Sequence, residues 1–143
     1  MSSLREQILA RIATALAAAT PGGAQVFRSR EVAITKGISP VIVVLMGGET
    51  DSRMSASTDK HQLRAVLAIF VRGDPWDQLA DAVATPMHQA VMNDAGLQAL
   101  VLDVRKVSSE PESEEADRTA GTLSVTYEIT YLTRAGDIAA API

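Results

Sequence analysis

The sequence predicts an α+β fold, in which two main helices pack on one face of a mostly antiparallel sheet of about five strands. Two stretches space their apolar residues as a helix does, and five others are β-prone or alternate apolar with polar side chains. The length of 143 residues is that of one typical domain. We therefore expect residues 1–143 to form a single domain.

The first helix is predicted over residues 4–19. Ser3, followed three positions later by Glu6, has the pattern of a capping box. An apolar residue then recurs at every fourth position and forms one stripe along the helix. The stripe consists of Leu4, Ile8, Ile12 and Leu16. Pro-Gly-Gly at 21–23 ends the helix.

Two strands are predicted next. The β-prone stretch 24–34 carries Arg28, Arg30 and Glu31, and such charges are typical of a strand near the edge of a sheet. The continuous apolar run at 40–46, "PVIVVLM", is typical of a strand buried on both faces.

The segment 47–61 has no periodicity and almost no apolar content. Long connections of this kind are commonly functional or disordered, so we expect a mobile loop here, with Arg53 and Lys60 on it. Residues 62–72 then alternate apolar and polar side chains, which predicts a strand with one buried face.

The tripeptide Arg72-Gly73-Asp74 has the letters of a cell-adhesion signal. A structural interpretation explains each residue better: Arg72 ends the strand and Gly73 makes the turn. Asp74 then caps the next helix and Pro75 takes its first position. The N-terminus has no basic region leading into an apolar stretch, so no secretory signal is expected.

The second helix follows this junction, and its apolar residues keep helical spacing. The predicted apolar face comprises Trp76, Leu79, Ala80, Val83, Met87, Ala90 and Val91. Pro86 lies inside it and is expected to kink or split the helix, since proline removes a backbone hydrogen bond. Asn93, Asp94 and Gly96 form the predicted end.

The C-terminal part predicts two more strands. Residues 100–107 are β-prone, and residues 122–133 show the clearest period-two alternation in the chain. Between them, 108–120 is rich in acidic residues and is expected to be a second mobile loop. Residues 134–143 are expected to form a short tail.

Composition excludes several classes of protein. The net charge is −4 and the basic residues are scattered, which argues against a specific nucleic-acid surface. The chain has no cysteine, so it has neither disulfides nor thiolate metal sites. No apolar run approaches the roughly 20 residues that a membrane helix needs, so no membrane partner is expected. The cytoplasm is the default location.

Catalytic and cofactor motifs are not recognisable in the sequence. Glycine-rich nucleotide loops and a Gly-x-Ser-x-Gly elbow do not occur. The two histidines, His61 and His88, have no partner at metal-ligand spacing, although Asp77 or Asp81 could approach His88. The sequence thus favours a protein that is not an enzyme and has no cofactor.

The order of elements resembles the tail terminator proteins of long-tailed phages, the group related to the minor tail protein U of lambdoid phages. An N-terminal helix is followed by "VFRSREVAI" and "PVIVVLMGGE". After the polar segment come "RAVLAIFVRGDPWDQLADAV", "MHQAVMND" and "EADRTAGTLSVTYEITYLTRAGD". The resemblance covers nearly the whole chain and lies in element order, since the family has no diagnostic site motif.

The resemblance implies a structural virion protein, encoded by a phage or prophage, that assembles with copies of itself into a six-membered ring. The ring would cap the tail tube, stop its polymerisation and present a docking surface for a head-completion protein. Its partners would then be itself, the tail tube protein and the head-completion protein. The protein would be assembled in the bacterial cytoplasm and reside in the virion tail.

The charged side chains on the predicted loops and strands are the candidates for contacts with other subunits or with the tube. They are Arg28, Arg30, Glu31, Arg53, Lys60, Glu128 and Arg134. Ordinary surface charge is the competing interpretation for each. Two alternative functions stay open: another head–tail connector protein, and a small ligand-binding domain or enzyme with a pocket near 47–61.

Overall fold

The computed structural model describes residues 2–28, 40–114 and 117–142 and shows a five-stranded sheet with helices. The strands are β1 (Gln25–Arg28), β2 (Val41–Ser55), β3 (Thr58–Arg72), β4 (Asp103–Glu114) and β5 (Asp117–Arg134). The helices are α1 (Leu4–Ala19), α2 (Trp76–Met92) and the short α3 (Ala95–Gln98), with a 3-10 turn at Pro21–Gly23. The predicted α+β class is confirmed.

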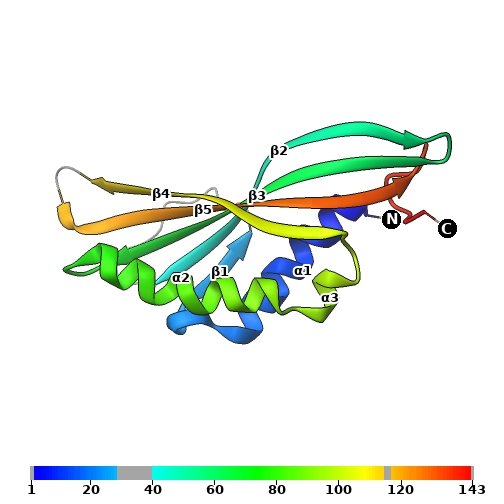
Figure 1. The fold of residues 1–143 in the computed structure, drawn as a ribbon. Coiled ribbons are helices and arrows are strands. Elements are labelled where there is room, and N and C mark those ends of the chain that lie inside the picture. The colour runs from blue at the N-terminus through cyan, green and yellow to red at the C-terminus, as the bar shows by residue number, and fades with distance from the viewer. Residues whose placement is uncertain (1, 29–39, 115–116, 143) are drawn as a thin grey trace.

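The strand order across the sheet is β1-β2-β3-β5-β4. Only the β1–β2 pair is parallel, and the other three pairs are antiparallel. In Figure 1 the sheet is strongly twisted along its length, and the three helices lie beneath it in that view. At one end, β2, β3 and β5 run on beyond the helices toward the two chain termini.

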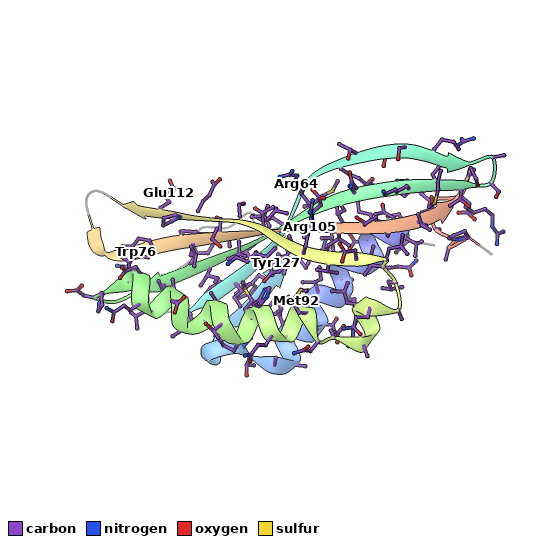
Figure 2. The ribbon with its side chains drawn as sticks, viewed as in Figure 1. Arg64, Trp76, Met92, Arg105, Glu112 and Tyr127 are labelled. Carbon is purple, nitrogen blue, oxygen red and sulfur yellow. The ribbon has the colours of Figure 1, made fainter. Side chains whose placement is uncertain are left out.

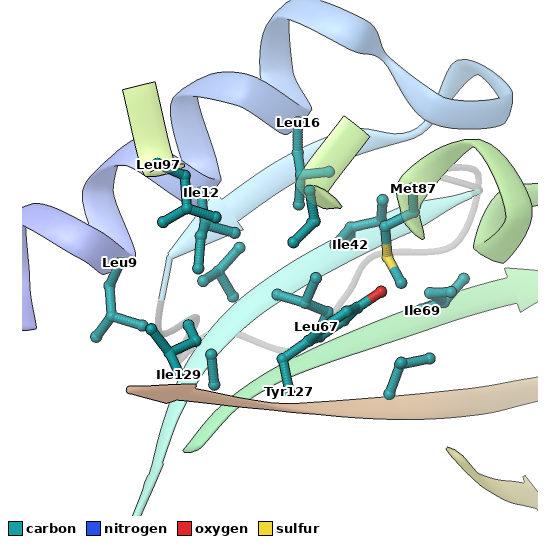
Figure 3. Packing of buried hydrophobic residues seen from close by; sticks show 14 of the residues in the cluster. Leu9, Ile12, Leu16, Ile42, Leu67, Ile69, Met87, Leu97, Tyr127 and Ile129 are labelled. Carbon is teal, nitrogen blue, oxygen red and sulfur yellow. The ribbon is translucent and has the colours of Figure 1, made fainter. Parts of the chain in front are cut away.

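The apolar core lies between the helices and the sheet (Figure 3). The stripe predicted for α1 is buried, and the helix has the predicted bounds, 4–19. The Ser3 hydroxyl accepts a hydrogen bond from the Glu6 backbone N–H at 3.1 Å, which confirms the cap. On the sheet, the predicted apolar alternation of β3 and β5 faces this core, with Leu67 and Ile129 fully buried.

The junction before α2 differs from the prediction by one residue. The helix begins at Trp76, Pro75 stands in the capping position, and no side chain accepts a capping hydrogen bond there. Asp74 therefore is not the cap. Gly73 makes the turn with a φ of +144°, a conformation that favours glycine. Leu79, predicted on the buried face, is 40% exposed.

Pro86 lies inside α2, which continues from 76 to 92, so the expected split does not occur. Asn93 caps its C-terminus, and Asp94 starts α3 by accepting a hydrogen bond from the Leu97 backbone N–H. The Asp94 carboxylate also receives two hydrogen bonds from the Arg11 guanidinium, each 2.7 Å long. This pair joins α1 to the end of α2.

The two segments predicted as loops are largely strand. Residues 47–61 form the distal halves of β2 and β3 around a tight turn at 56–57, and residues 108–114 and 117–120 extend β4 and β5. The prediction relied on apolar alternation to recognise strands. These strands extend beyond the helix layer, so neither face needs an apolar stripe, and their polar sequences resemble those of loops. Residues 115–116 lie outside the described part, as do Arg30, Glu31 and most of the predicted strand 24–34. In the described residues, no helix is long and apolar enough to span a membrane.

Candidate functional site

A connected group of polar side chains lies where the sheet leaves the helices. We call residues 47–61 of β2 and β3, with residues 130–134 of β5, the arm. Strand register places Asp51 opposite His61, and His61 opposite Tyr131. Glu49 and Thr133 stand two residues along the same face, because alternate residues of a strand share a face. We call these five residues the arm cluster.

His61 is the centre of the arm cluster and is only 6% exposed. Its Nδ1 lies 2.5 Å from Asp51 Oδ1, and its Nε2 lies 2.7 Å from Thr133 Oγ1. The imidazole also stacks on the Tyr131 ring, with 4.7 Å between centroids. A buried histidine with both ring nitrogens bonded fixes the side chains around it, which holds β2, β3 and β5 in register.

Glu49 connects the arm cluster to α1. Its carboxylate accepts a 2.6 Å hydrogen bond from the Tyr131 hydroxyl and pairs with the Arg5 guanidinium at 3.1 Å. Burial raises the pKa of the Tyr131 phenol, and its bond to Glu49 adds to this increase. The phenol therefore stays protonated and remains a donor.

The order Thr133–His61–Asp51 has the hydrogen-bond pattern of a hydrolase triad. The Thr133 hydroxyl, however, is in a fully buried side chain. A substrate carbonyl has to come within about 3 Å of the nucleophile, and the packed sheet prevents this approach. The arrangement as described is therefore structural.

Glu49, Asp51 and His61 also form the kind of group that could hold a metal ion, with ligand atoms all within 4.8 Å of one another. His61 has no partner at metal-ligand spacing along the sequence, but strand pairing brings Glu49 and Asp51 close to it in the fold. The expectation that His61 lacks such partners is therefore wrong. Each of the three groups is already hydrogen-bonded within the chain, and the Arg5 charge beside Glu49 opposes a cation.

His88 has a partner other than the predicted Asp77 or Asp81. Its Nδ1 lies 2.8 Å from the Tyr127 hydroxyl, and the two rings stack with centroids 5.7 Å apart. Burial raises the pKa of Tyr127 to about 12. The pair satisfies a polar hydroxyl at the edge of the core.

The structure places the predicted contact residues at separate points of the chain. Glu128 is on the face of the sheet away from the helices, where it pairs with Arg105 at 2.9 Å and with Arg64 at 3.6 Å. Figure 2 shows Arg64 and Arg105 close together above the sheet. These three residues tie β3, β5 and β4 together, so Glu128 already has a structural role within the subunit.

Arg28 pairs with Glu6 of α1 at 2.9 Å, and this contact lowers the pKa of the Glu6 carboxyl. Arg53 pairs with Asp59 across the hairpin at 2.6 Å. Arg134, at the end of β5, lines a cavity of about 250 Å³. Its other lining residues are Ser57, Thr58 and Pro142. Of the predicted residues that the structure describes, Arg53, Lys60 and Arg134 lie together on the arm.

Sequence reasoning missed the arm cluster. A signal was present: charged residues occupy alternate positions at 49, 51 and 53, and again at 59 and 61. Period-two spacing of charges predicts a strand pair with a polar face, but a search for apolar alternation does not detect it.

The fold is that of a known virion component. A chain from a structure described as the virion of a native gene transfer agent particle is similar, with a TM-score of 0.54 and 13% identity. The match covers 91% of this chain and 92% of that chain. At this identity the likeness shows the fold alone.

The sequence identifies the family. The family model described as phage minor tail protein U matches residues 2–131, and the chain belongs to this family. No curated protein matches it. The chain is therefore a structural protein of the phage tail type.

Proposed function

We propose that this protein forms a closed ring on the end of the phage tail tube, stops tube polymerisation there and provides the surface on which the head docks. The observation that carries the proposal is the family match over nearly the whole chain. The fold likeness to a chain of a virion particle supports it independently of sequence identity.

The mechanism would be one of complementary surfaces. A ring offers the tube a matching face and offers the other side to something that is not tube protein, so growth stops without bond chemistry. A net charge of −4 suits a passage through which DNA slides, since basic groups would bind phosphates. No specific nucleic-acid binding is part of the proposal.

The arm is the part of the subunit best placed to reach a neighbour. It continues the sheet beyond the helices (Figure 1), and Met54 near its tip is 59% exposed. Arg53, Lys60 and Arg134 belong to it, and they remain the favoured candidates for contacts with other subunits or with the tube. Glu128 and Arg28 are weaker candidates because their charges are paired within the chain.

The second candidate function is that of another head–tail connector protein. The family match and the fold likeness would fit equally well a protein that binds the head before the tail tube. A pocket enzyme is less supported: the cavity near the turn of the arm is smaller than typical ligand sites of roughly 300–1,000 Å³.

Electron microscopy of the purified protein over a wide concentration range tests the ring. Six-membered closed rings are expected. Adding the protein to polymerising tail tube protein should then limit tube length and leave one ring at a tube end. Rings that co-sediment with heads and never with tubes would favour the connector function instead.

A further inference from the structure

We propose that neighbouring copies in the ring join edge to edge: β2 of one copy, over residues 46–54, pairs antiparallel with β4 of the next copy, over residues 103–111. The inference rests on the proposed ring and names the surface that builds it. It follows from the two edges of the sheet.

The β2 edge along the arm has no partner strand among residues 2–28, 40–114 and 117–142. β1 pairs only with Val41–Val44, and among the described residues no strand pairs with that side of β2 from residue 45 onward. Open edges are usually protected by unpaired charges or proline. Here Glu49 and Arg53 are ion-paired within the subunit, so neither charge protects the edge. The Asp51 carboxylate, which is bonded to His61, is exposed and would need an opposite charge on the incoming strand.

The β4 edge, on the opposite side of the sheet, is protected most strongly in its second half, and in its first half Lys106 is an exposed charge. Pro111 removes a backbone donor, and Glu110 and Glu112 beside it are exposed. In the first half, Arg105 is paired with Glu128. An incoming strand could therefore pair with the first half and would stop near Pro111.

Exposed apolar side chains mark the same two edges. The described part of the chain has six large apolar side chains that are exposed, and four of them belong to these edges. The four are Met46 and Met54 on β2, Leu102 just before β4, and Val107 within it. Two exposed apolar side chains thus belong to each of the two edges.

Strand directions fix the geometry. β2 runs antiparallel to β3, β3 to β5, and β5 to β4, so β4 runs opposite to β2. Rotation about a ring axis preserves strand direction along that axis. β4 of one copy therefore meets β2 of the next in the antiparallel sense, through two different surfaces, as a closed ring requires.

One register satisfies both edges. Placing Lys106 opposite Asp51 sets two exposed, opposite charges on the same face of the joined sheet. Met54 then comes opposite Asp103, and Pro111 comes opposite Met46. Pairing would thus end just before β1 occupies the edge. The two segments of nine residues would lie along each other for about 30 Å. Each contains an irregularity, between Met46 and Glu49 in β2 and between Lys106 and Ser108 in β4, where regular pairing would be interrupted.

Disulfide cross-linking tests this register, and the absence of cysteine makes the result unambiguous. Ser52→Cys combined with Arg105→Cys places two thiols directly opposite each other between copies. Within one copy they cannot meet, because β3 and β5 separate β2 from β4 by about 14 Å, and a disulfide needs Cα atoms closer than about 7 Å. Ser52→Cys with Leu79→Cys is the matched control, since Leu79 is exposed on α2.

A ladder of disulfide-linked oligomers up to the ring size is expected for 52/105 and none for 52/79. Suppose that the unmodified protein forms rings but the 52/105 variant is linked no better than the control. That result would overturn the edge pairing, and the proposed ring would stand. If neither rings nor cross-links form, both the proposed ring and the edge pairing are overturned. Cross-linked dimers from Ser52→Cys alone would replace the proposal with symmetric β2–β2 pairing.

A charge reversal gives a second test that does not touch the interior. Lys106→Glu places a like charge opposite Asp51 and should raise the concentration for half-assembly about fivefold. Glu112→Lys, beyond the paired segment, is the control and should leave that concentration unchanged. Equal effects of the two substitutions would contradict the register.

Discussion

The two ends of the sheet are stabilised by different interiors. Under the helices, the sheet carries a continuous apolar core in which side chains such as Leu67 and Ile69 are fully buried. In the arm, the same face of the same strands carries His61, which is hydrogen-bonded to Thr133 and stacked on Tyr131, and the Tyr131 hydroxyl donates to Glu49. Apolar packing is non-directional and tolerates substitutions of similar volume, whereas a hydrogen-bonded network specifies one geometry. The difference indicates a body that supplies stability and an arm that supplies defined shape.

The largest effect is expected in the core. Leu67→Ala should lower the free energy of unfolding by about 2–5 kcal/mol, because it leaves a cavity beneath the helices. Denaturant unfolding of the whole chain measures this. Leu102→Ala, at a side chain 61% exposed, is the control and should change stability by less than about 0.5 kcal/mol. Equal losses would contradict the assignment of Leu67 to the packed core.

Close packing between α2 and β5 gives the next effect. A Cβ added to Gly121 would clash with the Trp76 ring, so Gly121→Ala has to displace the indole. The expected loss of stability is about 1–3 kcal/mol. Gly48→Ala is the matched control, since its added Cβ would meet nothing within 4 Å. Indole fluorescence should shift in the first variant and stay constant in the second.

The arm should respond locally. His61→Ala leaves the buried Thr133 hydroxyl without its partner, at a cost of about 1–3 kcal/mol. Amide hydrogen exchange should accelerate in residues 49–62 and 130–134 while protection under the helices persists. Lys60→Ala, on the opposite face of β3, is the control. Exchange that accelerates equally throughout would mean that arm and body unfold as one unit.

The smallest effect concerns the ion pair between Arg11 and Asp94. The hydrogen bonds from Arg11 hold the pKa of the Asp94 carboxyl below its usual value. Stability from this pair is therefore complete above the unfolded-state pKa and is lost as pH falls through the folded-state pKa. Stability of Arg11→Met should be slightly lower near pH 7 and should fall less steeply between about pH 5 and pH 2. Identical acid profiles would show that the pair contributes nothing, as many exposed pairs do.

Much of the body could be predicted from the sequence, because apolar spacing and burial have the same period there. The stripe of α1 and the alternation of 122–133 are examples. The arm could not, since hydrogen bonds between Asp51, His61 and Thr133 depend on strand register, which no local pattern in the polar segments reveals. The start of α2 was misjudged by one residue because Asp74 followed by Pro75 matches the preferred residues of a cap and a first helical position. In the structure Pro75 takes the capping position instead, without a side-chain capping bond.

The contact of Trp76 with Gly121 has a spectroscopic consequence. Trp76 is the only tryptophan of the chain, and Gly121 and Thr133 are twelve residues, or about 40 Å, apart along β5. The fluorescence of Trp76 therefore responds to changes in the body and does not respond to changes confined to the arm. A quencher or acceptor dye attached at Ser52 of one copy would approach another copy's indole only through assembly, so the natural chromophore can follow ring formation in real time.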